Sequence, residues 1–230
     1  MGEIVIQVNA VCKGYSLSNT GSISGDLNNW ILWKKSKKLV NTFWALQDIN
    51  FDVKKGERLA ITGDNGAGKS TLLKILSKIT RPTKGIIIGK GKITSMLEVG
   101  TGFHPELSGI ENIFLNGAML GMSRHDISNK IDEIVAFSEI SEHINTPVKR
   151  YSTGMYMRLA FATAAHLQSE IMIIDEVLAV GDDRFKHKSL DKLKSLSIEF
   201  GKTIILVSHD QQHINSFCNR EIRLSNGFIR

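Results

Sequence analysis

The C-terminal part of the chain alternates between short apolar runs and longer amphipathic stretches. From residue 169 it reads strand, helix, strand, helix, in the runs IMIID, RFKHKSLDKLKSLSIEF, TIILVS and QQHINSFC. Short strands that are apolar throughout are typical of parallel sheets buried on both faces. The pattern therefore predicts an α/β fold in which helices cover both sides of a parallel sheet.

The N-terminal part is patterned as strands separated by polar segments. A first strand begins at EIVIQV and ends near Tyr15, and a strand pattern returns at residue 45 with ALQDINFDV. This second strand runs through KKGE into the apolar stretch RLAIT, and such a short glycine-containing connection predicts a β-hairpin. Residues 16–43 are polar at first and then aromatic and basic, which indicates an inserted segment.

Helical periodicity dominates residues 99–168, which predicts an inserted helical lobe. The runs SGIENIFLNGAML and SRHDISNKIDEIVAFSEI both read as helices. Ser108 and Glu111 have the spacing of a capping box, and Ser123 with Asp126 is a weaker version of it. In the second helix four apolar residues share one face: Ile127, Ile131, Ile134 and Val135.

Composition narrows the class of protein only slightly. The 230 residues, 42% hydrophobic and 23% charged, suit one soluble globular core. A net charge of +6 suits an anionic partner such as a nucleotide, nucleic acid or an acidic membrane face, and equally a basic solvated surface. Cys12 and Cys218 are isolated, which favours a reducing compartment over a disulfide framework. No signal peptide is expected, and the apolar runs are shorter than the roughly 20 residues of a spanning helix.

The stretch GDNGAGKST matches the phosphate-loop pattern, with Gly63, Gly68, Lys69 and Ser70 at the required spacing. An apolar strand precedes it and a helix follows it, a context that disfavours the alternative of an ordinary glycine-rich turn. Lys69 is expected to reach the β- and γ-phosphates and Ser70 to ligate Mg²⁺. The expected phosphate-binding residues are Gly63, Asn65, Gly66, Ala67, Gly68, Lys69, Ser70 and Thr71. Asp64 is expected to point to solvent.

The run IMIIDE supplies the other half of a nucleotide site. Its strand delivers Asp175 toward the Mg²⁺ shell, and Glu176 follows, placed to orient or deprotonate an attacking water. A competing run, NKID at residues 129–132, matches a guanine-specificity motif of GTPases. That motif belongs at the end of an apolar strand, whereas here it lies in an amphipathic helix, so we do not interpret it as a guanine site.

The run YSTGMYMRLAFA resembles the signature region of ATP-binding-cassette (ABC) proteins. Ser152 and Gly154 match the signature serine and glycine, while Tyr151, Thr153 and Met155 depart from the usual residues. In the family this turn faces the γ-phosphate held by a second subunit. The resemblance also implies that His209, in LVSHD, contacts the γ-phosphate, and that LAVGD, residues 178–182, crosses the dimer interface.

The resemblance covers residues 3–230 and implies one ABC ATPase domain over 1–230. Its expected parts are a RecA-like parallel sheet core, an antiparallel β subdomain and an inserted helical subdomain. Glu176, His209 and Lys69 are the expected catalytic residues, with Mg²⁺ as cofactor. Tyr15 is expected either to stack on adenine or to be a simple edge-strand aromatic.

Three features together resemble the polysaccharide-exporter branch, which moves lipid-linked O-antigen, capsule or teichoic-acid chains. They are the 16–43 insertion, the run YSTGMYMRLAFA, and Glu98 at the position of a usual Mg²⁺-sensing glutamine, where it is also an expected Mg²⁺ ligand. The branch implies a homodimer at the cytoplasmic face of the bacterial inner membrane, bound to a permease. No nucleic-acid partner is expected. The chain stops about 20 residues after His209, so a C-terminal carbohydrate-binding domain is not expected.

Alternatives remain at two levels. Another cargo, such as a drug, peptide or simple lipid, is compatible with the same ATPase, and a soluble ABC protein acting on nucleic acid or ribosomes is a more distant alternative. Within 16–43, Trp30 and Trp33 precede four lysines, Lys34, Lys35, Lys37 and Lys38. This segment is either a membrane or partner contact or a solvated loop.

Overall fold

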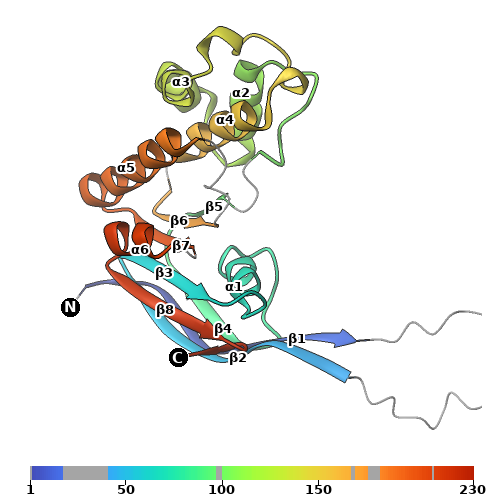
Figure 1. Ribbon diagram of the computed structural model, residues 1–230, viewed down its shortest axis with the longest axis vertical. Coiled ribbons are helices and arrows are strands. Elements are labelled where there is room, and N and C mark those ends of the chain that lie inside the picture. Colours follow the sequence, from blue (N-terminus) through green and yellow to red (C-terminus); the bar gives the residue numbers. More distant parts are fainter. Residues whose placement is uncertain (1, 18–40, 97–99, 167–168, 176–181, 209) are drawn as a thin grey trace, which may run out of the picture.

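The computed structural model describes residues 2–17, 41–96, 100–166, 169–175, 182–208 and 210–230. Two sheets and a group of helices make up this part of the chain (Figure 1). The smaller sheet has the strand order β2-β1-β4 and is antiparallel. Its strands are β1 (Ile4–Leu17), β2 (Asn41–Lys54) and β4 (Lys84–Gly89).

The larger sheet has the strand order β5-β6-β7-β3-β8-β9 and is parallel except for the last strand. Its strands are β3 (Arg58–Gly63), β5 (Ile93–Ser95), β6 (Ile171–Ile174), β7 (Thr203–Val207), β8 (Arg220–Ser225) and β9 (Phe228–Ile229). Every residue of β6 and β7 is buried. The prediction of apolar parallel strands is confirmed.

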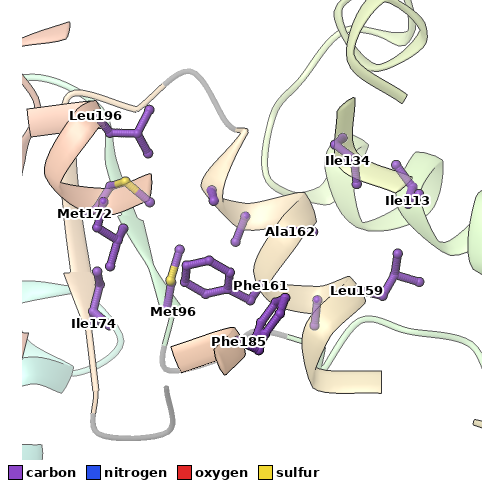
Figure 2. Close-up of a cluster of buried hydrophobic side chains, with 14 of the residues drawn as sticks. Met96, Ile113, Ile134, Leu159, Phe161, Ala162, Met172, Ile174, Phe185 and Leu196 are labelled. Atoms are coloured by element: carbon purple, nitrogen blue, oxygen red, sulfur yellow. The ribbon is translucent and has the colours of Figure 1, made fainter. Parts of the chain in front are cut away.

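Side chains of β6 alternate between two cores, one on each face of the larger sheet. Met172 and Ile174 belong to a core shared with the helical side, and Figure 2 shows them near Phe161 and Phe185. Ile171 and Ile173 belong to the other core, which includes β1, β2 and α1 (Lys69–Leu76). Both faces are therefore covered, which explains why the strand is apolar without alternation.

The three helices α2 (Gly109–Met119), α3 (Arg124–Ser138) and α4 (Thr153–Ala165) lie between β5 and β6 in the chain. They gather at one end of the molecule, with the smaller sheet at the other end (Figure 1). The Ser108–Glu111 capping box is present in both directions, and the Ser123 hydroxyl accepts from the Asp126 amide at 3.1 Å. The predicted apolar face of α3 also packs inward, because Ile127 and Ile134 are buried and Ile131 and Val135 pack against the same core.

Two further helices, α5 (Asp183–Phe200) and α6 (Gln211–Phe217), follow β6 and β7 in the predicted order. Two short 3₁₀ helices, Ser141–His143 and Val148–Arg150, connect α3 to α4. The NKID run lies inside α3, as expected. Among the described residues, none of the helices combines the length and the apolar character needed to span a membrane.

The predicted hairpin between the second strand and RLAIT is wrong. β2 pairs with β1 in the smaller sheet, whereas β3 pairs with β7 and β8 in the larger one. The short turn at residues 54–57 passes the chain from one sheet to the other, with the Glu57 amide donating to the Lys54 carbonyl at 3.1 Å. The physical reason is burial: β3 is apolar and needs parallel neighbours and cover on both faces.

The actual hairpin joins β1 and β2. Their pairing runs from Ile4 opposite Lys54 to Leu17 opposite Asn41. The strands therefore extend two or three residues into the segment 16–43 that the sequence marks as inserted. Residues 18–40, including both tryptophans and the four lysines, lie outside the described residues.

Candidate functional site

The phosphate loop connects the end of β3 to the start of α1. Gly63 has φ 140° and Gly68 has φ 106°, values in the region that favours glycine. A Cβ at Gly68 would lie 2.6 Å from the Ala45 carbonyl oxygen, and one at Gly63 would overlap the Leu224 carbonyl. Both glycines are therefore required by backbone angle and by close packing against neighbouring strands.

Lys69 begins α1 and folds back over the loop. Its ammonium donates to the carbonyl oxygens of Gly63 at 2.6 Å and Asp64 at 3.0 Å. No side chain caps the N-terminus of α1, and its first turn holds no acidic residue. The positive end of the helix and the lysine therefore act at the same place, which suits an anion such as a phosphate.

A pocket of about 420 Å³ opens beside this loop. It is lined by Tyr15, Phe43, Ala45, Asn65, Gly66, Gly68, Lys69, Ser70, Thr71, Asp175 and Val207. Tyr15, the loop and Asp175 come from three separate parts of the sequence. The folded chain brings them together in one site.

Asp175 follows β6 at the carboxyl edge of the sheet. Burial raises the pKa of its carboxyl, and the positive charge of Lys69 opposes that shift. Ser70 lies in the same pocket, so a hydroxyl and a carboxylate are available together. These are the oxygen ligands that Mg²⁺ prefers, since it is usually held by one or two protein oxygens with substrate phosphates. Among the described residues, no group of three or more His, Cys, Asp or Glu forms a metal cluster.

Three of the loop residues 63–71 lie outside the lining of this pocket: Gly63, Asp64 and Ala67. Ala67 is 3% exposed and packs in the core beside β1 and β2, away from the pocket lining. Its side chain therefore packs the loop against the sheet, and its expected contact with phosphate stays a prediction. Asp64 is exposed and lies outside the pocket lining, as expected.

The signature turn is built at the start of α4. Ser152 caps the helix by accepting from the Met155 amide at 3.2 Å, and Thr153 is exposed. A Cβ at Gly154 would meet nothing closer than the Ser152 hydroxyl at 3.9 Å. The Tyr151 side chain instead makes a contact within the helical lobe, because its hydroxyl donates to the His143 carbonyl at 2.9 Å.

None of residues 151–155 lines the pocket beside Lys69. The signature turn and the phosphate loop of one chain therefore do not form a single site. Glu98, Glu176 and His209 lie outside the described residues. Their expected roles stay predictions.

Phe43 is a pocket residue that sequence reasoning missed. It stands directly opposite Tyr15 in the β1–β2 pairing. Its position just before the second strand pattern was a signal, but its partner could only be known once the register was known.

Arg158 on α4 was also missed. Its guanidinium binds Asp182 at 2.7 Å and Glu139 at 3.2 Å. Asp182, the last residue of LAVGD, caps α5 by accepting from the Phe185 amide at 2.8 Å. The signature helix is thereby tied to the start of α5.

The fold and site define a phosphate-loop nucleotide-binding protein with an inserted helical lobe. The family model for the ABC transporter matches residues 46–179, more than half of the chain. The chain therefore belongs to the ABC transporter family.

Curated relatives carry export names. The chain is 44% identical over 209 residues to the "O-antigen export system ATP-binding protein RfbB" of Myxococcus xanthus, covering 91% of this chain and 48% of that protein. It is 42% identical over 188 residues to RfbB of Klebsiella pneumoniae, covering 82% and 76%. It is 39% identical over 231 residues to the "Teichoic acids export ATP-binding protein TagH" of Listeria monocytogenes, covering 100% and 67%. The chain thus spans about half of the first relative and more of the others.

Solved structures agree on the fold. The dimeric post-hydrolysis state of the ATP-binding cassette MJ0796, bound to ADP and Pi, superposes with a TM-score of 0.76 at 24% identity, over 98% of this chain and 96% of that one. An ATP-binding subunit of an ABC transporter gives 0.77 at 22% identity, over 98% and 88%. The expected ABC ATPase fold is confirmed.

Proposed function

We propose that this protein is the ATP-hydrolysing subunit of an exporter of lipid-linked polysaccharide. The observation that carries the proposal is the convergence of Lys69, Ser70 and Asp175 in one pocket. The assignment of the cargo rests on the relatives, whose names refer to O-antigen and teichoic-acid export. The protein works at the cytoplasmic face of the inner membrane, bound to a separate permease.

ATP binds with its phosphates on the phosphate loop. The Lys69 ammonium, now on loop carbonyls at 2.6 and 3.0 Å, exchanges one or both of these contacts for phosphate oxygens. The backbone amides at the start of α1 add further donors. Ser70 and Asp175 would hold Mg²⁺, which when bound neutralises charge on the phosphates.

Hydrolysis needs a residue that orients or deprotonates water, and Glu176 has this role in the proposal. It follows Asp175 directly in the sequence. His209, which comes two residues after the end of β7, contacts the γ-phosphate. β7 is the neighbour of β6 in the sheet, and these two parallel strands end at the same edge, with Ile174 and Val207 as their last residues.

Two copies of the chain complete two sites. Each ATP lies between the Lys69 loop of one copy and the Ser152–Gly154 turn of the other. The support is that Ser152 and Thr153 are exposed and that the turn lies apart from the chain's own pocket. ATP then adds contacts across the interface and hydrolysis removes them, which makes nucleotide state a switch that the permease can follow.

The test is depletion of the protein in its own host, followed by complementation. Wild type and the control variant Glu199→Gln, changed at an exposed position on α5, are expected to restore surface polysaccharide. Glu176→Gln is expected to leave lipid-linked polymer inside, and its sugar composition identifies the cargo. Purified Glu176→Gln is expected to bind ATP as wild type does and to hydrolyse it at least about 100-fold more slowly.

Two results would contradict parts of the proposal. Surface polysaccharide that is unchanged on depletion removes the polysaccharide cargo. Hydrolysis by Glu176→Gln at the wild-type rate shows that another group activates water.

A further inference from the structure

A second pocket, of about 440 Å³, lies between the C-terminal end of α1 and the β4 edge of the smaller sheet. This is the end of the molecule away from the helical lobe (Figure 1). Among the described residues it shares no lining residue with the Lys69 pocket. Roughly 300–1,000 Å³ is typical of small-molecule sites. Its apolar lining consists mainly of aliphatic side chains: Ile6, Ile75, Leu76, Ile86, Ile87 and Ile93.

Several isoleucines around this pocket are exposed. Ile86 is 55% exposed, Ile88 is 46% and Ile79 is 45% exposed. Ile86 and Ile88 alternate with Ile87 along β4, so both point away from the core that Ile87 packs against. Ile79 stands between two lining residues in the sequence. A group of exposed large apolar side chains beside a pocket marks a surface that contacts a partner.

The segment that forms most of this pocket is strongly basic. Residues 65–97 contain seven lysines and arginines and neither an aspartate nor a glutamate, so they carry +7, whereas the whole chain carries +6. Lys69 belongs to the ATP site, and the other six are exposed. These six are Lys74, Lys78, Arg81, Lys84, Lys90 and Lys92. A dense positive charge without interspersed acids favours an anionic partner.

Three of these cations are placed around the pocket. Lys78 and Arg81 line it, and Lys90 directly follows the last residue of β4. Within the described part of the chain none of the three forms an ion pair. Lys84 and Lys92 contact other parts of the chain, an aromatic ring and a backbone carbonyl. Lys78, Arg81 and Lys90 are therefore available to an external anion.

The loop that carries Arg81 is held in place by β1. The Lys13 ammonium donates to the Thr80 hydroxyl at 3.1 Å and to the Arg81 carbonyl at 2.8 Å. Thr80 is the other lining residue with a polar side chain besides Lys78 and Arg81. The lining thus combines an apolar wall with two exposed cations. It suits a ligand with a hydrocarbon part and a negatively charged group.

We propose that this surface binds the anionic lipid surface of a membrane, as a contact of the chain itself in addition to the permease of the proposed function. Lipid phosphates lie at the cations, and the isoleucines enter the boundary between head groups and acyl chains. A nucleic acid would leave the isoleucines without a partner, and an apolar protein segment would leave the cations without one. We call this surface the Ile86 face; it consists of Lys78, Ile79, Arg81, Ile86, Ile88 and Lys90.

The experiment measures co-sedimentation of the purified full chain with vesicles. One set is phosphatidylcholine, and the other is equal parts of phosphatidylcholine and phosphatidylglycerol. The variants are the pair Lys78→Gln/Arg81→Gln, which removes charge, and Ile86→Ser, which removes apolar area. The matched controls change exposed residues outside the pocket: the pair Lys194→Gln/Arg230→Gln and the single variant Ile198→Ser.

Wild type is expected to bind the phosphatidylglycerol vesicles and to bind phosphatidylcholine only weakly. Each cation at an anionic surface contributes about fivefold in affinity, so Lys78→Gln/Arg81→Gln should bind roughly 25-fold more weakly. Ile86→Ser should lose roughly fivefold, since the apolar contact is lost. Both controls should bind as wild type does. Unchanged thermal unfolding midpoints in all variants exclude a folding defect as the cause.

Three results overturn the lipid contact and leave the proposed function intact. The first is wild-type binding that is absent or equal for the two kinds of vesicle. The second is wild-type affinity in Lys78→Gln/Arg81→Gln. The third is a variant pair that keeps vesicle binding but loses binding to an RNA oligonucleotide or co-purification with the permease, which would assign the Ile86 face to that partner instead.

Discussion

Several positively charged side chains lie around the C-terminal end of the signature helix. Lys202 is one of them, and its pKa is strongly shifted. Burial, together with the positive charges of Lys130 and Lys192, lowers the pKa of Lys202 to about 8. Lys130 donates to the His166 carbonyl at 3.0 Å, at the end of α4. Burial also lowers the pKa of the His166 imidazole. Cations are stabilised at this end of a helix by its macrodipole, which offsets part of their mutual repulsion.

Lys202 makes stability depend on pH in a defined window. Its pKa is about 8 in the folded chain against an ordinary 10.5, so between these values the unfolded chain holds more protons. The free energy of unfolding should therefore gain a contribution that rises with pH between about 8 and 10.5, by at most about 1.4 kcal/mol per pH unit. Urea unfolding of wild type and Lys202→Gln across this range measures the difference.

The control for this series is Lys194→Gln, which removes a lysine at an exposed position on α5. The free energy of unfolding of this variant should depend on pH as it does in wild type. A Lys202→Gln curve parallel to wild type from pH 8 to 10.5 would show that the Lys202 proton is not coupled to folding.

At the scale of elements, Arg158 joins three helices. Its two bonds connect α4 to Glu139 at the end of α3 and to Asp182 at the start of α5. Its guanidinium also lies 5.0 Å from the Phe185 ring centroid. Lys188 on α5 binds Glu139 at 2.7 Å but adds no bond to Asp182. Arg158 thus links the signature helix to Asp182, the last residue of the run LAVGD, which the family resemblance predicts to cross the dimer interface.

Replacing Arg158 by methionine keeps an unbranched apolar side chain on Phe185 and removes the charge. In the proposed dimer the turn at Ser152 would then be less well positioned against the partner's ATP, so kcat should fall by roughly 10- to 100-fold with little change in KM. Lys188→Met is the matched control, since it removes a charge on Glu139 and leaves the Asp182 link. Steady-state ATPase assays check this, and equal kcat in the two variants would exclude a positioning role for Arg158.

In the whole molecule, the two parts of the proposed ATP site lie on separate elements. The phosphate loop lies between β3 and α1, while the signature turn starts the last helix of the lobe. The lobe packs on the face of the larger sheet opposite to α1, as the two cores show. One chain therefore carries two half-sites, and in the proposed dimer each would be completed by the other copy.

Mixing variants tests this arrangement directly. Lys69→Ala damages the loop, and Gly154→Asp places a negative charge on the turn that, in the proposed dimer, faces the partner's γ-phosphate. Each variant alone should be inactive, because both sites of its dimer carry the lesion. The mixture should recover ATPase activity, since a mixed dimer has one undamaged site.

Lys74→Ala, on the exposed side of α1, serves as a control that stays active alone. A mixture of Lys69→Ala and Gly154→Asp as inactive as its components would contradict shared sites, provided that both chains co-purify as a dimer.

What the sequence by itself determined is local. The phosphate loop, the helix caps at Ser108 and Ser123 and the buried run before Asp175 depend on residues close together in the chain, so their spacing carries the information. The pairing of β2 with β1, the meeting of Phe43 with Tyr15 and the link from Arg158 to Asp182 were decided only by the tertiary structure. These contacts join distant residues, and strand register and burial choose among partners that the linear pattern leaves equivalent.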